Sequence, residues 1–170
     1  SFDSDGICNY CRQIEELESM YKTGEKEGED EFYKIVDEIK EKGKNSKYDL
    51  IIGVSGGTDS SYLLHLSHQL GLRPLAVHYD NTWNTAIATQ NIKKVVTKLN
   101  IDLDTYVIDS KEQDAILLSF MKAGICGVDA ATDLALAEVM YRMANKHNVA
   151  YVFEGHSFQT EGVSPIGVSY

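Results

Sequence analysis

The residues best suited to chemistry form one run, Ser55–Ser60, which reads Ser-Gly-Gly-Thr-Asp-Ser. Gly56 and Gly57 permit backbone dihedrals closed to other residues and let main-chain N–H groups approach a ligand closely. Because the run lies between an apolar and an amphipathic segment, we expect it to join a strand to a helix, whose first N–H groups favour an anion. The serines add hydroxyl groups, and Asp59 beside an anion implies a bridging divalent cation. The run indicates a phosphate-binding loop that uses Mg²⁺.

The same run has a simpler interpretation as a tight turn capped by Asp59 and Ser60, because both residue types are good N-caps. The whole pattern at a strand–helix junction favours phosphate binding over that alternative. The run lacks the Gly-Lys-Ser/Thr of a Walker A motif, so it contains no lysine to reach the terminal phosphates. We therefore expect it to hold pyrophosphate as a leaving group.

The elements that position this loop follow from hydrophobic periodicity after residue 47. Residues 50–54 are continuously apolar, as a buried parallel strand should be. Strands and helices then alternate: helix 59–70, strand 75–79, helix 84–99, strand 103–108, helices 113–123 and 132–147, and strand 150–154. The pattern predicts an α/β, Rossmann-like fold, in which a parallel sheet of four to five strands carries helices on both faces and binds ligands at the carboxyl ends of its strands.

The first 46 residues differ from the rest. Residues 1–12 are short, polar and loop-like, and residues 14–41 are rich in Glu and Lys with apolar positions at helical spacing. Gly24 and Gly28 predict a break, so we expect a solvated pair of helices. The predicted division is 1–46 and 47–170. The Gly and Pro near the end suggest that the chain continues, and we expect it to be the front piece of a longer protein.

Composition narrows the possible partners. Asp and Glu number 26 against 16 Lys and Arg, and the net charge of −10 disfavours nucleic acid as the main partner. No apolar run reaches the ~18 residues of a membrane span, and nothing at the start resembles a signal peptide. Three cysteines cannot all pair internally, so we expect a protein of the reducing cytoplasm.

The Ser55–Ser60 run resembles the signature of the PP-loop ATP pyrophosphatases, the adenine nucleotide α-hydrolase-like superfamily. That resemblance implies that ATP is cleaved between its α- and β-phosphates, with transient adenylylation of a carbonyl oxygen. Further stretches resemble one branch, the N-acetyl sugar amidotransferases of lipopolysaccharide and O-antigen biosynthesis: residues 8–11, 77–84, 131–133 and 155–162. This branch is understood to convert the acetamido group of a nucleotide-linked N-acetyl sugar to an acetamidino group, with ammonia from a glutaminase subunit.

The resemblance implies roles for single residues. The loop would hold the β- and γ-phosphates, Asp59 would ligate Mg²⁺, the second strand would line the adenine, and the end of the fourth would approach the α-phosphate. The residues implied to bind ATP are Ser55, Gly56, Gly57, Thr58, Asp59, Ser60, Val77, His78, Tyr79, Gly155 and His156. Those implied to act in catalysis are Asp59, Asp133, His156 and Glu161.

Several of these residues have structural alternatives. His78 is equally well a satisfied strand histidine. Asp133 has an alternative as a first-turn helix carboxylate and Glu161 as a loop residue, and the resemblance favours the functional role for both. Trp83 is either a packing residue or a stacking surface for the sugar nucleotide.

The cysteines also leave alternatives open. Cys8 and Cys11 form a Cys-x-x-Cys pair, which suits half of a Zn²⁺ site or a redox motif, and we favour zinc. Cys126 is either a sulfur carrier or an inert buried thiol.

Three rival functions remain. A PP-loop tRNA sulfurtransferase would use Cys126 as a persulfide carrier, although the acidic charge opposes tRNA contact. A non-catalytic nucleotide-binding module would hold ATP without cleaving it. An ammonia-dependent synthetase would share the activation step and act on a carboxylate.

Overall fold

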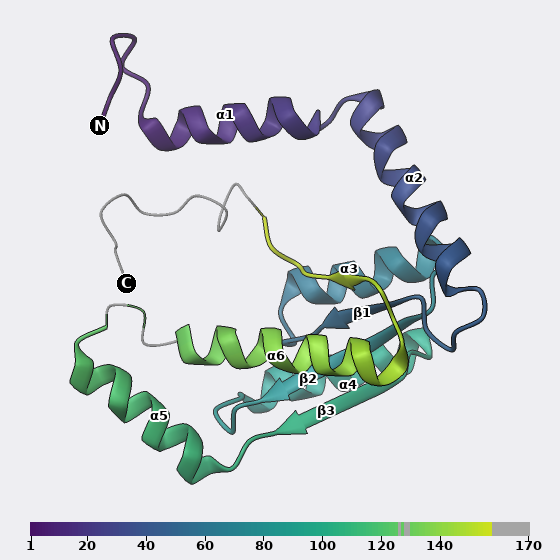
Figure 1. The fold of residues 1–170 in the computed structure, drawn as a ribbon, viewed down its shortest axis with the longest axis vertical. Helices are drawn as coiled ribbons and strands as arrows, with labels where there is room; N and C mark the ends of the chain where they lie inside the picture. The colour runs from purple at the N-terminus through teal and green to yellow at the C-terminus, as the bar shows by residue number, and fades with distance from the viewer. Residues whose placement is uncertain (126, 128–129, 158–170) are drawn as a thin grey trace. The chain divides into compact units, whose positions relative to one another are not determined.

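We analysed a computed structural model that describes residues 1–125, 127 and 130–157 (Figure 1). The described residues divide into two compact units, residues 39–155 and residues 1–38 together with His156 and Ser157. The division expected at residue 46 remains a prediction. Cys126 and Glu161 lie outside the described residues.

The larger unit contains a parallel sheet of four strands in the order β3-β2-β1-β4 (Figure 1). The strands are β1 (Leu50–Gly53), β2 (Pro74–Asp80), β3 (Leu103–Val107) and β4 (Val152–Phe153). All three pairings are parallel. The predicted α/β fold with a parallel sheet is confirmed.

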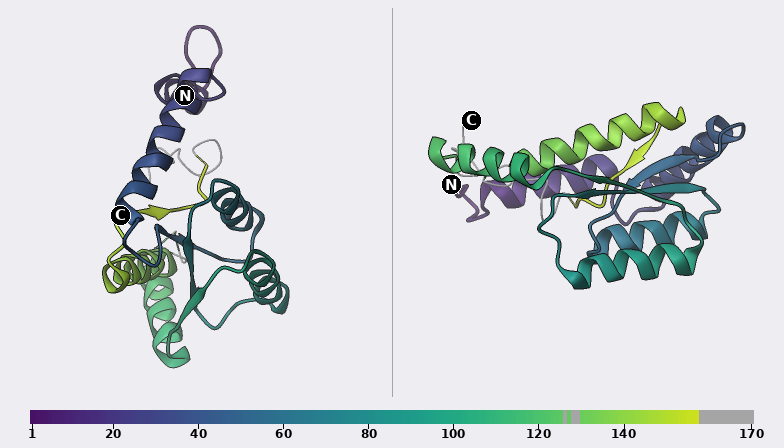
Figure 2. Two further views of the ribbon diagram at one scale, coloured as in Figure 1. Left: turned by 90° about the vertical axis from the view of Figure 1, so that its right-hand side faces the viewer. Right: turned by 90° about the horizontal axis from the view of Figure 1, so that it is seen from below.

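Helices cover both faces of this sheet. Figure 2 shows α3 (Thr58–Gln69) and α4 (Ala86–Leu99) on one face and α6 (Ala130–His147) on the other, while α5 (Ser110–Ala123) follows β3. Two covered faces explain why β1 reads as a continuous apolar run, since Leu50, Ile51 and Ile52 are completely buried. Beneath α6, the core joins Val77 and Tyr79 of β2 to apolar residues of that helix.

The last strand is shorter than the predicted 150–154. β4 pairs only with β1, because it is an edge strand, and its two residues are half-buried. Its register with β1 still brings the chain to the carboxyl end of the sheet at Gly155.

The smaller unit contains α1 (Asn9–Tyr21) and most of α2 (Lys26–Gly43), whose last residues from Ile39 belong to the larger unit. The expectation that residues 1–12 form a loop is wrong for residues 9–12, because Cys8 acts as the N-cap and starts α1 directly after it. The Sγ of Cys8 accepts a hydrogen bond from the N–H of Cys11. The predicted break falls at residues 22–25, where Gly24 adopts a positive φ of 80°.

Candidate functional site

The loop after β1 is shaped by its contact with α4. Gly56 has a φ of +81°, which L side chains rarely adopt, and a Cβ there would lie 2.8 Å from the carbonyl carbon of Ala88. The side-chain amide of Asn91 donates to the Gly56 carbonyl at 3.2 Å. The first two turns of α4 therefore support the loop from behind and leave room only for glycine at position 56.

The N-terminus of α3 lacks a side-chain cap. Gly57 is the N-cap, in an extended conformation, and makes no side-chain capping hydrogen bond. The alternative interpretation of the motif required Asp59 and Ser60 to cap the helix, and neither of them does. Because the first N–H groups of a helix have no intrahelical partner, this end offers main-chain donors and a partial positive charge to an anion.

The polar side chains of the motif point in two directions. Thr58 and Asp59 are exposed, whereas Ser60 is buried and its hydroxyl oxygen accepts from the Ser55 N–H at 3.4 Å. Asp59 is thus accessible as a cation ligand at the helix end. Ser60 instead holds the beginning of the loop against the first turn of α3.

The end of β4 closely approaches the same helix end. A Cβ at Gly155 would lie 3.2 Å from the backbone nitrogen of Ser60 and 3.3 Å from the carbonyl carbon of Asp59. The structure therefore brings the end of β4 close to the loop after β1, and the role of Gly155 at a phosphate site stays a prediction. Asp133 is exposed in the first turn of α6, and no contact joins it to the loop among those observed. His156 belongs to the other compact unit.

The predicted adenine-lining residues of β2 are buried. Val77 and Tyr79 pack beneath α6, and the Tyr79 hydroxyl donates to Gln113 Oε1 at 3.2 Å. Burial raises the pKa of Tyr79. His78 lies on the other face of the strand, with Nδ1 2.8 Å from the Val54 carbonyl oxygen. Val77 and Tyr79 are thus core residues, and His78 supports the loop through Val54.

The turn after β2 is held by side-chain hydrogen bonds. Asp80 Oδ1 accepts from the Thr82 N–H and from the Asn84 amide, both at 2.8 Å, and Asn81 Oδ1 accepts from the Trp83 N–H at 3.0 Å. Thr82 adopts a φ of +68°, which is unusual for a β-branched residue. The indole of Trp83 remains 55% exposed.

A groove of about 310 Å³ lies between the beginning of α3 and α4. It is lined by Gly56, Gly57, Thr58, Ser61, Asn91, Lys94 and Val95. The Ser55–Ser60 motif contains no lysine, and Lys94 of α4 provides a cation beside the loop. The sequence analysis did not predict this residue. The available signal was its spacing, because Lys94 is three residues from Asn91 and therefore on the same helix face.

The Cys-x-x-Cys pair has the geometry of two interacting thiols. Cys8 Sγ and Cys11 Sγ lie 3.1 Å apart, and this contact lowers the pKa of Cys8 and raises that of Cys11. Two thiolates on one tetrahedral Zn²⁺ would be about 3.8 Å apart for Zn–S bonds of about 2.3 Å. Among the described residues, no group of three or more His, Cys, Asp or Glu side chains is placed to hold a metal.

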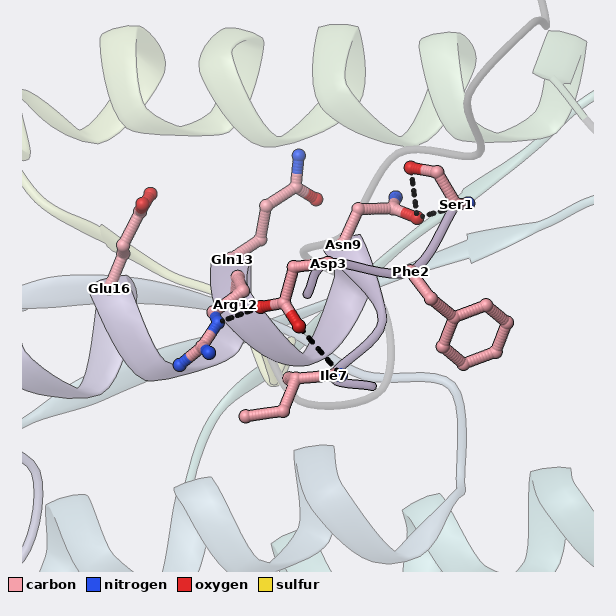
Figure 3. Close-up of a pocket in the computed structure, with 8 residues that line it drawn as sticks. All are labelled: Ser1, Phe2, Asp3, Ile7, Asn9, Arg12, Gln13 and Glu16. Atoms are coloured by element: carbon pink, nitrogen blue, oxygen red, sulfur yellow. Dashed lines mark hydrogen bonds and ion pairs between the residues drawn. The ribbon is translucent and has the colours of Figure 1, made fainter. Parts of the chain in front are cut away.

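The smaller unit also has a hollow of about 410 Å³, shown in Figure 3. There the Arg12 guanidinium donates from Nε to Asp3 at 2.8 Å and from Nη1 to Glu15 at 2.9 Å. Hydrogen bonding from the Ile7 N–H and from Arg12 lowers the pKa of Asp3. These exposed ion pairs organise the turn before α1, and the hollow is lined by ordinary surface residues.

Comparisons with known proteins identify the fold. No family model matches the chain, and no curated protein matches it. Solved structures that resemble it include the NH3-dependent NAD synthetase from Campylobacter jejuni, with 21% identity over 70% of this chain and 52% of that one, and a TM-score of 0.51. The NMN synthetase from Francisella tularensis shows 20% identity over 70% of this chain and 50% of that one, with the same TM-score of 0.51.

The glutamine-dependent NAD+ synthetase from Acinetobacter baumannii shows 17% identity over 68% of this chain and 23% of that one, with a TM-score of 0.51. At these identities the likeness shows a shared fold. The chain spans about half the length of the first two of these proteins. No helix in the described part of the chain is long and apolar enough to cross a membrane.

Proposed function

We propose that this chain is the ATP-binding part of a PP-loop enzyme that activates a carbonyl oxygen with AMP and then replaces that oxygen with ammonia. The observation that carries this proposal is the uncapped N-terminus of α3, placed directly after the Gly56 turn at the carboxyl end of β1. An anion bound there meets main-chain N–H groups and the positive end of a helix dipole. The shared fold supports the same superfamily.

The first step transfers AMP. Main-chain N–H groups of residues 56–60 would hold the β- and γ-phosphates, with Lys94 as an additional cation on the α4 side. The exposed carboxylate of Asp59 fits a Mg²⁺ ion, which prefers one or two carboxylates together with phosphate oxygens. When bound, Mg²⁺ would neutralise charge on the departing pyrophosphate. The chain thereby stabilises the leaving group.

The acceptor that we propose is the acetamido group of a nucleotide-linked N-acetyl sugar. Its carbonyl oxygen attacks the α-phosphorus, and the bond from that phosphorus to the bridging oxygen breaks to release pyrophosphate. Ammonia then attacks the activated carbon, AMP leaves with the former amide oxygen, and the added nitrogen loses a proton to give an acetamidino group. As the resemblance to sugar amidotransferases implies, we assign Asp133 to contact with the substrate or the metal, Glu161 to orienting the substrate, and His156 to an approach to the α-phosphate of ATP.

The proposed partner is a glutaminase subunit that supplies ammonia, and the proposed setting is surface polysaccharide biosynthesis in the cytoplasm. A zinc site at Cys8 and Cys11 is part of the same proposal, and it requires two ligands from outside the described residues. Those ligands would also have to separate the two sulfurs from their present 3.1 Å.

A second candidate differs only in the acceptor. One similar structure is an NH3-dependent NAD synthetase, and its dependence on NH3 supports the alternative of an ammonia-dependent synthetase, which would act on a carboxylate. The tRNA sulfurtransferase alternative is disfavoured by the net charge of −10. A module that binds ATP without cleaving it would have the same phosphate-binding loop, but it would release neither AMP nor pyrophosphate.

The test uses the full-length protein with ATP, MgCl2 and ammonium chloride. Nucleotide-linked N-acetyl sugars and small carboxylic acids are offered in separate arms, and AMP, pyrophosphate and the aminated product are measured by mass spectrometry with isotopically labelled ammonium. We expect AMP, pyrophosphate and a labelled amidino sugar. Labelled amide from a carboxylate would establish the second candidate, and ADP with inorganic phosphate would contradict both.

A further inference from the structure

The carboxyl end of β2 offers no free aromatic or apolar side chain from the strand itself. Val77, His78 and Tyr79 are 0%, 6% and 7% exposed. The Tyr79 ring stacks on Tyr106 of the neighbouring strand β3, with ring centroids 6.3 Å apart. A nucleotide whose phosphates lie at the uncapped end of α3 must therefore find a surface for its base on another residue.

Trp83 is a large exposed aromatic side chain at this edge, and it is the only tryptophan in the 170 residues. Trp83 is more than half exposed and so gains little from apolar burial, yet its turn is held by hydrogen bonds that the Thr82 N–H donates to Asp80 and the Trp83 N–H donates to Asn81. The turn also holds Thr82 in the left-handed region, where a β-branched residue is strained. The turn thus holds the backbone of Trp83 in a defined conformation in spite of local strain.

A short path of hydrogen bonds connects this turn to the phosphate loop. The Val54 carbonyl can only accept, so His78 Nδ1, 2.8 Å away, carries the proton. His78 Nε2 is then an acceptor, and the Asn84 amide nitrogen lies 3.3 Å from it. Asn84 also donates to Asp80 Oδ1. His78 therefore links the residue before Ser55 to the residue after Trp83.

Helix α4 makes a second connection between the two turns. Thr85 caps α4 directly after the turn, accepting from the Ala88 N–H at 3.2 Å. The backbone of Ala88 lies close to Gly56, and the Asn91 side-chain amide donates a hydrogen bond to the Gly56 carbonyl. The turn that contains Trp83 is thus connected to the phosphate loop by two routes.

We infer that Trp83 is the surface on which the adenine ring of ATP stacks, with His78 and Asn84 as positioning residues that hold its turn in register with the phosphate loop. This inference rests on the proposed function, because it takes the phosphates to lie at the Ser55–Ser60 loop. Stacking of a base on an aromatic ring contributes about tenfold to a hundredfold in affinity.

The test separates the base from the phosphates. ATP, tripolyphosphate and a uridine diphosphate N-acetyl sugar are titrated into the protein by calorimetry in the presence of Mg²⁺. Trp83→Leu should weaken ATP binding about tenfold to a hundredfold and leave tripolyphosphate binding unchanged, while Trp83→Phe should retain part of the affinity. Tyr141→Leu, at an exposed aromatic residue of α6, is the matched control and should change neither.

The outcomes distinguish the two proposals. Tripolyphosphate that fails to bind the wild-type protein contradicts the proposed function itself. Tripolyphosphate that binds, together with Trp83→Leu protein that binds ATP like the wild type, overturns the stacking inference alone. Loss of affinity for the sugar nucleotide instead of ATP would likewise overturn it, because the indole would then serve the acceptor.

Positioning by the turn has its own measurement. Asn84→Ala removes the contacts to both His78 and Asp80 and should lower ATP affinity without changing tripolyphosphate affinity. It should also change the quenching of Trp83 fluorescence by acrylamide, taken as the difference from the Trp83→Phe protein. Asn145→Ala, at an exposed position of α6, is the control. Equal quenching in the Asn84→Ala and wild-type proteins would remove Asn84 from this role.

Discussion

The turns after β1 and β2 lie at neighbouring carboxyl ends of one parallel sheet, and they are built in opposite ways. The turn after β1 contains a glycine with positive φ and leads into a helix without a side-chain cap. The turn after β2 is held by the carboxylate of Asp80 and the amide of Asn81, and it places a threonine in the left-handed region. The first turn exposes main chain, whereas the second turn exposes one side chain.

If the proposed function and the stacking inference hold, this difference means that the two turns divide recognition of a nucleotide. Phosphates are recognised by N–H groups and a helix dipole, which require a small residue and close approach of the backbone. A base is recognised by an aromatic surface, which requires a side chain held in place. Substitutions in the first turn should therefore act through the backbone, and those in the second through side-chain position.

The largest effect is expected for Gly56→Ala, because the new Cβ would be strained by its φ and would also collide with Ala88. We expect the free energy of unfolding to fall by at least about 2 kcal/mol, with loss of tripolyphosphate binding. Gly71→Ala is the matched control, because Gly71 has a φ of +72° and open space around its Cβ position. It should lose only about 1 kcal/mol in denaturant unfolding. Equal losses in the two variants would show that α4 does not confine the loop.

Asp59→Asn should come next. Asn keeps the shape of the side chain and removes the charge that we assign to Mg²⁺, so pyrophosphate release should fall about a hundredfold, equivalent to about 2.7 kcal/mol in the barrier. Because Asp59 is exposed, the unfolding midpoint should not change. Asp114→Asn removes an exposed carboxylate of α5 and should leave the rate unaltered. Wild-type activity in the Asp59 variant would exclude it as the metal ligand.

Lys94→Met tests the cation beside the loop. Because Lys94 is exposed to water, its attraction to a phosphate charge about 4 Å away would be on the order of 1 kcal/mol, so tripolyphosphate affinity should fall up to about tenfold. The difference should shrink as salt concentration rises, because the pair is screened. Lys93→Met changes the net charge equally at a neighbouring exposed position outside the groove. The same loss in both variants would indicate a general charge effect.

The smallest effect is expected for Thr82→Asn in the second turn. Asn adopts the left-handed conformation more readily than a β-branched residue, so the free energy of unfolding should rise by about 0.5–1 kcal/mol. Thr97 lies within helix α4, so Thr97→Asn relieves no backbone strain and should not raise the free energy of unfolding. A destabilised Thr82→Asn protein would mean that the threonine side chain makes a contribution larger than the strain.

Much of this molecule follows from local sequence. The apolar run at 50–54 marks a strand buried on both faces, and the Ser-Gly-Gly-Thr-Asp-Ser pattern marks an anion-binding helix start, because periodicity and glycine conformation are local properties. The helices after β1, β2 and β3 were predicted nearly to their observed starts and ends. The beginning of α1 was missed, because a cysteine N-cap followed by a polar segment gives little periodic signal.

The sequence alone determined the order of strands and helices, the strand–loop–helix around Ser55–Ser60 and the acidic balance of the chain, since each depends on neighbouring residues or on composition. Tertiary structure decided which faces of β2 are buried, that Ala88 confines Gly56, and that Lys94 lines the groove beside the loop. These facts depend on how α4 and α6 pack against the sheet. Contacts between residues more than thirty positions apart are set by that packing, which no local pattern encodes.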